Sequence, residues 1–143
     1  MASHANHSTY DAHYHIVFPV KYRKALLQDE VVLAIPKIAS AIEQRYDIEF
    51  EKIGCDINHI HLLLSFKPSL STSEVVGLFK SITARELFKR FPQLRKDLWG
   101  GQFWSDGFYM ATVGERGNWN IVKKYIENQG KTMEEPPQLR LLA

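Results

Sequence analysis

Two histidines separated by one residue stand in the segment CDINHIHLLLSF of this 143-residue chain. Side chains two positions apart on a β-strand point to the same side of the sheet, so His59 and His61 would present their imidazoles together. Two neutral imidazoles on one face can hold a divalent metal ion. The alternative is a polar, solvent-facing side of an amphipathic strand, which a single His-x-His pair does not exclude.

A second pair with the same spacing, His13 and His15, lies in the segment HYHIVFPV. If the two segments form adjacent strands, the four histidines could assemble a zinc site. A polar strand face is again the alternative, and for His15 the sequence favours a structural role and a role in the site equally. Cys55 is the only cysteine, which excludes an internal disulfide and a zinc site built on cysteines.

The segment NWNIVKKYIENQGK predicts a last helix from about Asn118 to a glycine stop at Gly130. Tyr125 and Gln129 lie one turn apart on the apolar stripe of this helix. A phenol, an amide oxygen and two imidazoles are the components of metal-assisted phosphoryl transfer by a tyrosine nucleophile. The simpler alternative is a core tyrosine beside a glutamine exposed at the helix end.

Strands and helices alternate along the chain and would position these groups. Strands are predicted at residues 10–20, 48–55, 59–66 and 108–113, and helices at about 29–45, 72–91 and 118–130. Asp29 is the predicted cap of the first helix, and Ser71 or Thr72 that of the second. The order predicts an α+β fold: a split β-α-β, ferredoxin-like or RRM-like antiparallel sheet with helices on one face, followed by a C-terminal helix that carries the tyrosine. The other face of the sheet is predicted to be open and to carry the site.

Composition sets the class of protein. Hydrophobic residues make up 45% and charged residues 24%, values near the globular average. One domain is expected over residues 10–131, with loosely ordered ends at 1–9 and 132–143. No apolar stretch is long enough to cross a bilayer and no secretory signal is recognisable, so a cytoplasmic protein without a membrane partner is expected.

Several segments together resemble the TnpA-type single-tyrosine HUH transposases, which belong to insertion sequences of the two-hundred/six-hundred-five type. The resemblance spans about Tyr10 to Lys131, and its segments in order are YHIVFPVKYRKAL, CDINHIHLLLSF, LFKSITARELFKRFPQL, LWGGQFWSDGFYMATVG and VKKYIENQGK. One departure is Asn58, which stands before the first metal histidine where relatives often carry Asp.

The resemblance implies a complete site and reaction. His59, His61 and Gln129 would hold Mg²⁺ or Mn²⁺, and Tyr125 would be the nucleophile. The enzyme would cleave and rejoin single-stranded DNA at hairpin-marked element ends through a 5′-phosphotyrosine bond, releasing a 3′-hydroxyl and using no nucleotide cofactor. A homodimer is expected, in which the tyrosine helix can complete the partner's active site.

Basic and aromatic residues supply candidate DNA contacts. Between Lys80 and Lys96, six basic residues stand against one acid, which fits a surface that meets polyanions. The predicted DNA-binding residues are Lys21, Arg23, Lys80 and Arg85. Trp99 and Trp104 could stack on unpaired bases, although core packing is the more usual role of aromatics in such a segment.

Three other functions stay open at the level of sequence. One is an RRM-like nucleic-acid-binding module without catalysis, because such modules share the predicted fold. Another is a zinc or other metal-binding protein that uses the two His-x-His strands. A domesticated transposase that processes chromosomal repeats is the last.

Overall fold

The computed structural model describes residues 3–5, 8–10, 12–113 and 124 of the chain. The predicted last helix with Tyr125 and Gln129 lies outside these residues. Within the described residues, no helix is both long and apolar enough to cross a membrane.

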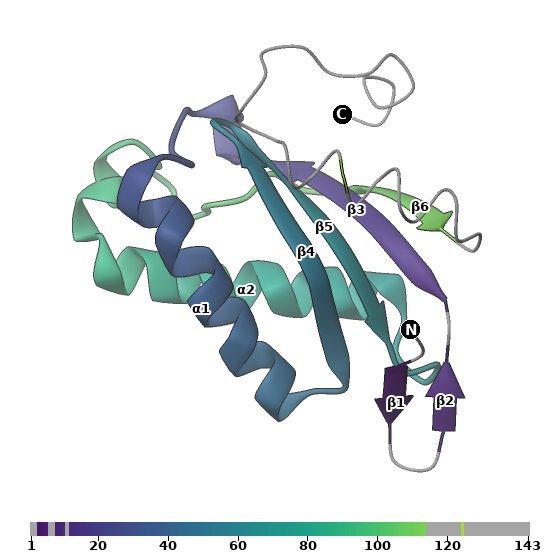
Figure 1. Ribbon diagram of the computed structural model, residues 1–143. Helices are drawn as coiled ribbons and strands as arrows, with labels where there is room; N and C mark the ends of the chain where they lie inside the picture. The colour runs from purple at the N-terminus through teal and green to yellow at the C-terminus, as the bar shows by residue number, and fades with distance from the viewer. Residues whose placement is uncertain (1–2, 6–7, 11, 114–123, 125–143) are drawn as a thin grey trace.

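A four-stranded antiparallel sheet forms the centre of the described structure, with the strand order β4-β5-β3-β6. The strands are β3 (His13–Pro19), β4 (Ile48–Asp56), β5 (His59–Phe66) and β6 (Tyr109–Val113). Two helices, α1 (Asp29–Arg45) and α2 (Thr72–Arg90), connect β3 to β4 and β5 to β6. Both helices cover the same face of the sheet (Figure 1). The split β-α-β fold with helices on one face is therefore confirmed.

Four shorter elements complete the described chain. Two 3-10 helices, η1 (Lys21–Arg23) and η2 (Pro92–Lys96), follow β3 and α2. Strands β1 (Ser3–Ala5) and β2 (Ser8–Tyr10) pair with each other in a separate two-stranded sheet.

Gln28, rather than the predicted Asp29, is the N-cap of α1. An N-cap residue has an extended backbone, which Gln28 adopts with φ −140° and ψ 156°. Asp29 instead has φ 50°, in the left-handed region. The side-chain amide of Gln28 donates to the carbonyl oxygen of Ala25 at 2.7 Å, so no side chain caps this helix. The prediction of an Asp29 cap was wrong because the residue type alone does not determine the backbone conformation at the start of the helix.

Ser71 caps α2 through a reciprocal pair of hydrogen bonds. Its hydroxyl accepts from the backbone N–H of Glu74 at 3.0 Å, and the Glu74 carboxylate accepts from the backbone N–H of Ser71 at 2.8 Å. This capping box satisfies two of the backbone donors that every helix start leaves unpaired. The same hydrogen bonds hold the pKa of Glu74 below its usual value.

The hydrophobic core lies between the sheet and the two helices. Ile60, Leu62 and Leu64 of β5 are at most 1% exposed and face α1 and α2. Ile35 of α1 and Phe79 of α2 meet them with exposures of 0% and 1%. The alternation predicted for β5 is confirmed on this side, where every second residue of the strand enters the core.

The second face of the sheet is buried over its two central strands rather than open throughout, which corrects the prediction for that part of the sheet. Its side chains on the central strands are His13, His15 and Val17 of β3 and His61, Leu63 and Ser65 of β5, all at most 7% exposed. The sequence contained the signal, because Leu62, Leu63 and Leu64 form a continuous apolar run. Such runs are typical of strands buried on both faces.

Strand β4 contains one irregularity. Phe50 pairs with Leu64 and Lys52 pairs with Leu63, so the register shifts by one residue between Phe50 and Lys52. Next to this bulge, the carboxylate of Glu43 on α1 accepts a hydrogen bond from the backbone N–H of Phe50 at 2.6 Å. The helix layer therefore contacts the backbone where the strand departs from regular pairing.

Candidate metal centre

Three potential metal ligands converge at one end of the sheet. Asp56 is the last residue of β4, and it pairs across the β4–β5 hairpin with His59, the first residue of β5. His61 lies two residues further along β5. The ligand atoms of the three side chains all lie within 4.8 Å of one another. Among the described residues, no other group of three or more His, Cys, Asp or Glu side chains meets this condition.

Hydrogen bonds orient both histidine rings toward the same carboxylate. His59 Nδ1 lies 2.8 Å from the side-chain oxygen of Asn58, and His61 Nδ1 lies 3.1 Å from His15 Nε2. The Nε2 atoms of His59 and His61 lie 2.8 Å and 4.0 Å from Asp56 Oδ2. With a proton on each Nδ1, both rings turn an Nε2 lone pair toward Asp56, the arrangement that a metal ion requires.

Asn58 performs the orienting role that a carboxylate at this position would also perform. Its amide oxygen is a good acceptor for the Nδ1–H of His59. The departure from the usual Asp therefore removes a negative charge near the centre while preserving the hydrogen bond.

Burial keeps the inner histidines neutral. Burial, together with the neighbouring His15 and His59, lowers the pKa of His61 to about 3, although Asp56 acts in the opposite direction. Burial also lowers the pKa of His15 to about 4. Both rings are therefore uncharged at neutral pH, the form in which imidazole binds a metal.

The donor set fits a divalent ion. Two imidazoles and one carboxylate combine ligands suited to first-row metals with a ligand suited to Mg²⁺ and Mn²⁺. Sequence reasoning missed Asp56. The signal was its place three residues before His59, because the two-residue turn at Ile57 and Asn58 brings the ends of the two strands together.

The structure does not bring four histidines into one site. His13 and His15 lie on β3, but neither belongs to the group formed by Asp56, His59 and His61. His15 instead contacts His61 edge to edge through ring nitrogens, and the two rings are nearly parallel, with centroids 5.3 Å apart. His15 thus supports a ligand and stands outside the cluster, and the geometry gives no support to the four-histidine zinc site.

The predicted DNA contacts fall in different parts of the molecule. Lys21 and Arg23 lie in η1, which follows β3 at the end of the sheet that carries the metal centre. Lys80 donates to the carbonyl oxygens of Ser105 and Gly107 at 2.7 Å and 2.6 Å, so its ammonium group fastens the 105–107 loop. Contact with DNA stays a prediction for all four residues.

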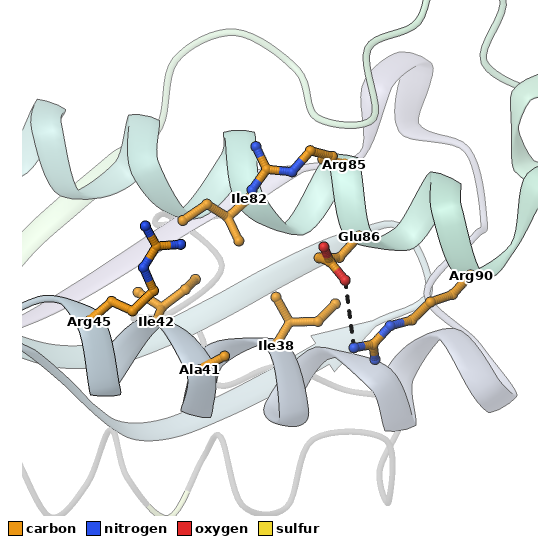
Figure 2. A pocket seen from close by; sticks show the side chains of 8 residues that line it. All are labelled: Ile38, Ala41, Ile42, Arg45, Ile82, Arg85, Glu86 and Arg90. Carbon is orange, nitrogen blue, oxygen red and sulfur yellow. Dashed lines mark ion pairs between the residues drawn. The ribbon is translucent and has the colours of Figure 1, made fainter.

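Arg85 lies on the helical layer, away from the histidine face. It lines a pocket of about 200 Å³ between α1 and α2 (Figure 2). The other lining residues are Ile38, Ala41, Ile42, Arg45, Ile82, Glu86 and Arg90. Glu86 pairs with Arg90 at 3.7 Å.

Comparison with known proteins decides the family. A family model described as IS200-like transposase matches residues 8–129, most of the chain. The chain belongs to the IS200-like transposase family. It is therefore a transposase and a DNA-processing enzyme, as the sequence predicted.

Two curated relatives agree with this assignment. This IS200-like chain is 35% identical over 120 residues to the ISDra2 transposase TnpA of Deinococcus radiodurans, covering 84% of this chain and 85% of that protein. It is 30% identical over 123 residues to the transposase for insertion sequence element IS200 of Salmonella typhimurium, covering 86% and 80% of the two chains.

Solved structures extend the agreement to the fold. A putative transposase from Deinococcus radiodurans superposes with a TM-score of 0.70 at 29% identity, covering 89% of this chain and 97% of the other. A REP-associated tyrosine transposase bound to a REP hairpin superposes with a TM-score of 0.54 at 12% identity, covering 90% and 72%. The second likeness concerns the fold alone.

Proposed function

We propose that this transposase cleaves and rejoins single-stranded DNA at hairpin-marked element ends through a covalent bond to Tyr125. The observation that carries the proposal is the convergence of Asp56, His59 and His61, with ligand atoms within 4.8 Å of one another, in a chain of the IS200-like family. Asp56, His59 and His61 would hold Mg²⁺ or Mn²⁺, together with Gln129 from the C-terminal segment.

The chemistry follows from the residue types. The oxygen of Tyr125 attacks the scissile phosphorus, a Tyr–O–P bond forms, and the P–O3′ bond breaks to leave a 3′-hydroxyl that carries the released proton. When bound, the metal ion would withdraw charge from the phosphate oxygens. Because the phosphotyrosine bond keeps the energy of the phosphodiester, a 3′-hydroxyl can reverse the attack and reseal a junction without a nucleotide cofactor.

Covalent adduct formation tests the proposal. The protein is incubated with Mn²⁺ and a labelled single-stranded hairpin oligonucleotide, and adducts are resolved on a denaturing gel. The wild type should form an adduct, and Tyr125→Phe should form none. Tyr109→Phe is a matched control, since it removes the hydroxyl of an exposed tyrosine on β6. Equal adduct formation by Tyr125→Phe and the wild type would overturn the assignment of the nucleophile.

Substitution at the metal centre tests the ligands separately. His61→Ala and Asp56→Asn should each lower the affinity for Mn²⁺ and the rate of adduct formation, because each removes a ligand from the cluster. Adduct formation that persists in EDTA would contradict a metal-dependent mechanism.

We further propose that two copies of the chain form the working enzyme, each recognising one DNA hairpin. Family membership supports this assembly, because the resemblance implies a homodimer in which the tyrosine segment of one copy can reach the metal centre of the other. Light scattering of the purified protein should give a mass near twice the chain mass of 16.5 kDa.

A further inference from the structure

Two large aromatic side chains lie exposed and in contact with each other. Tyr22 in η1 is 53% exposed, and Trp99, which follows η2, is 76% exposed. Their rings are stacked, with centroids 6.2 Å apart and an interplanar angle of 20°. Trp104, by contrast, is 4% exposed, and its indole N–H donates to the hydroxyl of Thr83 at 2.9 Å. The exposure of Trp99 thus sets it apart from Trp104, which belongs to the core.

The backbone of η1, which carries Tyr22, has an unusual conformation and is hydrogen-bonded on both sides. Tyr22 and Arg23 have φ values of 59° and 51°, a left-handed conformation uncommon for residues with a side chain. Arg23 N–H donates to the carbonyl oxygen of Val20 at 2.8 Å, and Lys21 N–H donates to that of Phe103 at 2.8 Å. The first of these hydrogen bonds closes the η1 turn, and the second joins η1 to the segment that follows Trp99. Tyr22 therefore lies on a turn that is hydrogen-bonded to the neighbouring chain segment.

The segment that carries Tyr22 lies next to the turn that carries the candidate metal ligands. Pro19, at the end of β3, pairs with His59, and the N–H of Val20 donates to the carbonyl oxygen of Asn58 at 2.9 Å. The N–H of Leu27, beyond η1, donates to the carbonyl oxygen of Ile57 at 2.9 Å. The η1 segment and the β4–β5 turn consequently lie side by side at one end of the sheet (Figure 1).

The surroundings of the pair are basic. Residues 21–24 and 95–97 together contain five basic side chains and one acidic side chain. The ammonium group of Lys21 lies 5.6 Å from the centre of the Tyr22 ring. Aromatic faces among positive charges are the features with which proteins bind single-stranded nucleic acids, because bases stack on the rings while phosphates meet the charges.

We propose that Tyr22 and Trp99 form a stacking platform for an unpaired base of single-stranded DNA beside the metal centre. The platform rests on the proposed function, since it supposes a single-stranded substrate. An unpaired base stacks on the exposed face of Trp99, while Lys21 and Arg23 contact the neighbouring phosphates.

Binding without cleavage tests the platform. A labelled oligothymidylate is titrated with protein in EDTA, and fluorescence anisotropy gives the dissociation constant. Trp99→Ala should weaken binding about tenfold, the usual effect of removing one stacking side chain. Trp99→Phe should restore most of the affinity, whereas Trp99→Leu, apolar but without a π-face, should not. Leu33→Ala is the control, because Leu33 is an equally exposed apolar residue at 68% on α1.

An abasic oligonucleotide of the same length separates stacking from charge. The affinity of the protein for this abasic DNA should not change in the Trp99→Ala variant, because no base is present to stack. The affinity should fall in Arg23→Ala, because the phosphates remain. Equal affinity of the wild type and Trp99→Ala for oligothymidylate would overturn the platform. A change of oligomeric state in Trp99→Ala with unchanged DNA affinity would overturn it too and would make the pair a protein contact.

The platform and the catalytic proposal fail in different ways. If oligothymidylate binding depends on Trp99 but no Mn²⁺-dependent adduct forms at Tyr125, the platform stands and the catalytic proposal falls. If the adduct forms but binding is indifferent to Trp99 and Tyr22, the catalytic proposal stands and the platform falls.

Discussion

The hydrogen bond between His15 and His61 assigns a proton within the metal centre. His61 can bind an ion through Nε2 only if its proton lies on Nδ1, and that atom faces His15 Nε2 at 3.1 Å. His15 must then accept with Nε2 and carry its own proton on Nδ1. His15 is thus a positioning residue for the proposed ligand His61: it fixes the tautomer and the rotation of that ring, as carboxylates and carbonyls do in known metal sites.

We expect His15→Ala to lower the affinity for Mn²⁺ by about tenfold, the smaller end of the effect of losing a ligand's hydrogen-bond partner. His15→Gln should recover part of the loss, since its amide oxygen can accept from His61 Nδ1. Isothermal titration calorimetry with Mn²⁺ measures both. His13→Ala is the control, because His13 is buried on the same strand but stands outside the cluster. A larger loss in His13→Ala than in His15→Ala would revive the four-histidine site.

The two neutral histidines make stability depend on pH. Their folded pKa values, about 3 for His61 and about 4 for His15, lie below the usual 6.5. The unfolded chain therefore binds more protons below pH 6.5, and the free energy of unfolding should fall as the pH decreases toward 4. Each histidine contributes a slope of up to about 1.4 kcal/mol per pH unit. Urea titrations in EDTA at several pH values measure this. His15→Gln should show a shallower slope, and a flat profile would contradict burial of neutral rings.

Among the elements, α2 was the most predictable, because residues close together in the sequence determine where the helix begins. Ser71 and Glu74 have the spacing of a capping box, and both hydrogen bonds are present. The first helix lacks such a signal, and there the predicted Asp29 cap was wrong. The alternation of β5 was correctly predicted, while the burial of its second face was not. Burial depends on segments distant in sequence, whereas alternation depends only on neighbours.

In the candidate site, too, features set by neighbouring residues were predictable and features set by distant segments were not. The proximity of His59 and His61 was predictable because their spacing alone places them on one side of a strand. Asp56 was missed because its proximity to His59 depends on strand pairing. The support that His15 gives to His61 needs the register of β3 against β5, which pairs His15 with Leu63 and Val17 with His61. No periodicity within one segment specifies that register.

Replacement of the cap tests the start of α2. Ser71→Ala should lower the free energy of unfolding by about 1 kcal/mol, the usual loss when a helix cap is removed. Thr72→Ala, one residue further along, should change stability much less because Thr72 makes neither hydrogen bond of the capping box. Urea unfolding at neutral pH compares the two. A loss in Thr72→Ala as large as that in Ser71→Ala would contradict the assignment of the cap.

At the scale of the whole molecule, the sheet separates two surfaces of different character. One side carries the candidate metal ligands. The other side is covered by α1 and α2 (Figure 1), with the arginine-lined pocket between the two helices (Figure 2). A homodimer would join two such molecules, and each metal centre would then need a tyrosine from one of the two chains.

Mixing two inactive variants tests which chain of the dimer supplies the tyrosine to each metal centre. Tyr125→Phe lacks the nucleophile, and the double variant His59→Ala, His61→Ala lacks two ligands. Neither alone should form the covalent adduct, but after subunit exchange a mixed dimer should regain it if Tyr125 acts on the partner's metal centre. A chain carrying all three substitutions, mixed with either variant, should stay inactive. Adduct recovery no greater than that of the separate variants would place the tyrosine with the histidines of its own chain.

The bulge in β4 decides on which side of the sheet the carboxylate of this centre emerges. Before it, even-numbered residues such as Phe50 point to the helices; after it, odd-numbered residues such as Ile53 do. Asp56 reaches the histidine side only because one additional residue reverses the alternation. Loss of a single residue there would send Asp56 toward the helices and leave two imidazoles without their anion. Glu43, which binds the backbone at this point, therefore links the helical layer to the chemistry on the opposite surface.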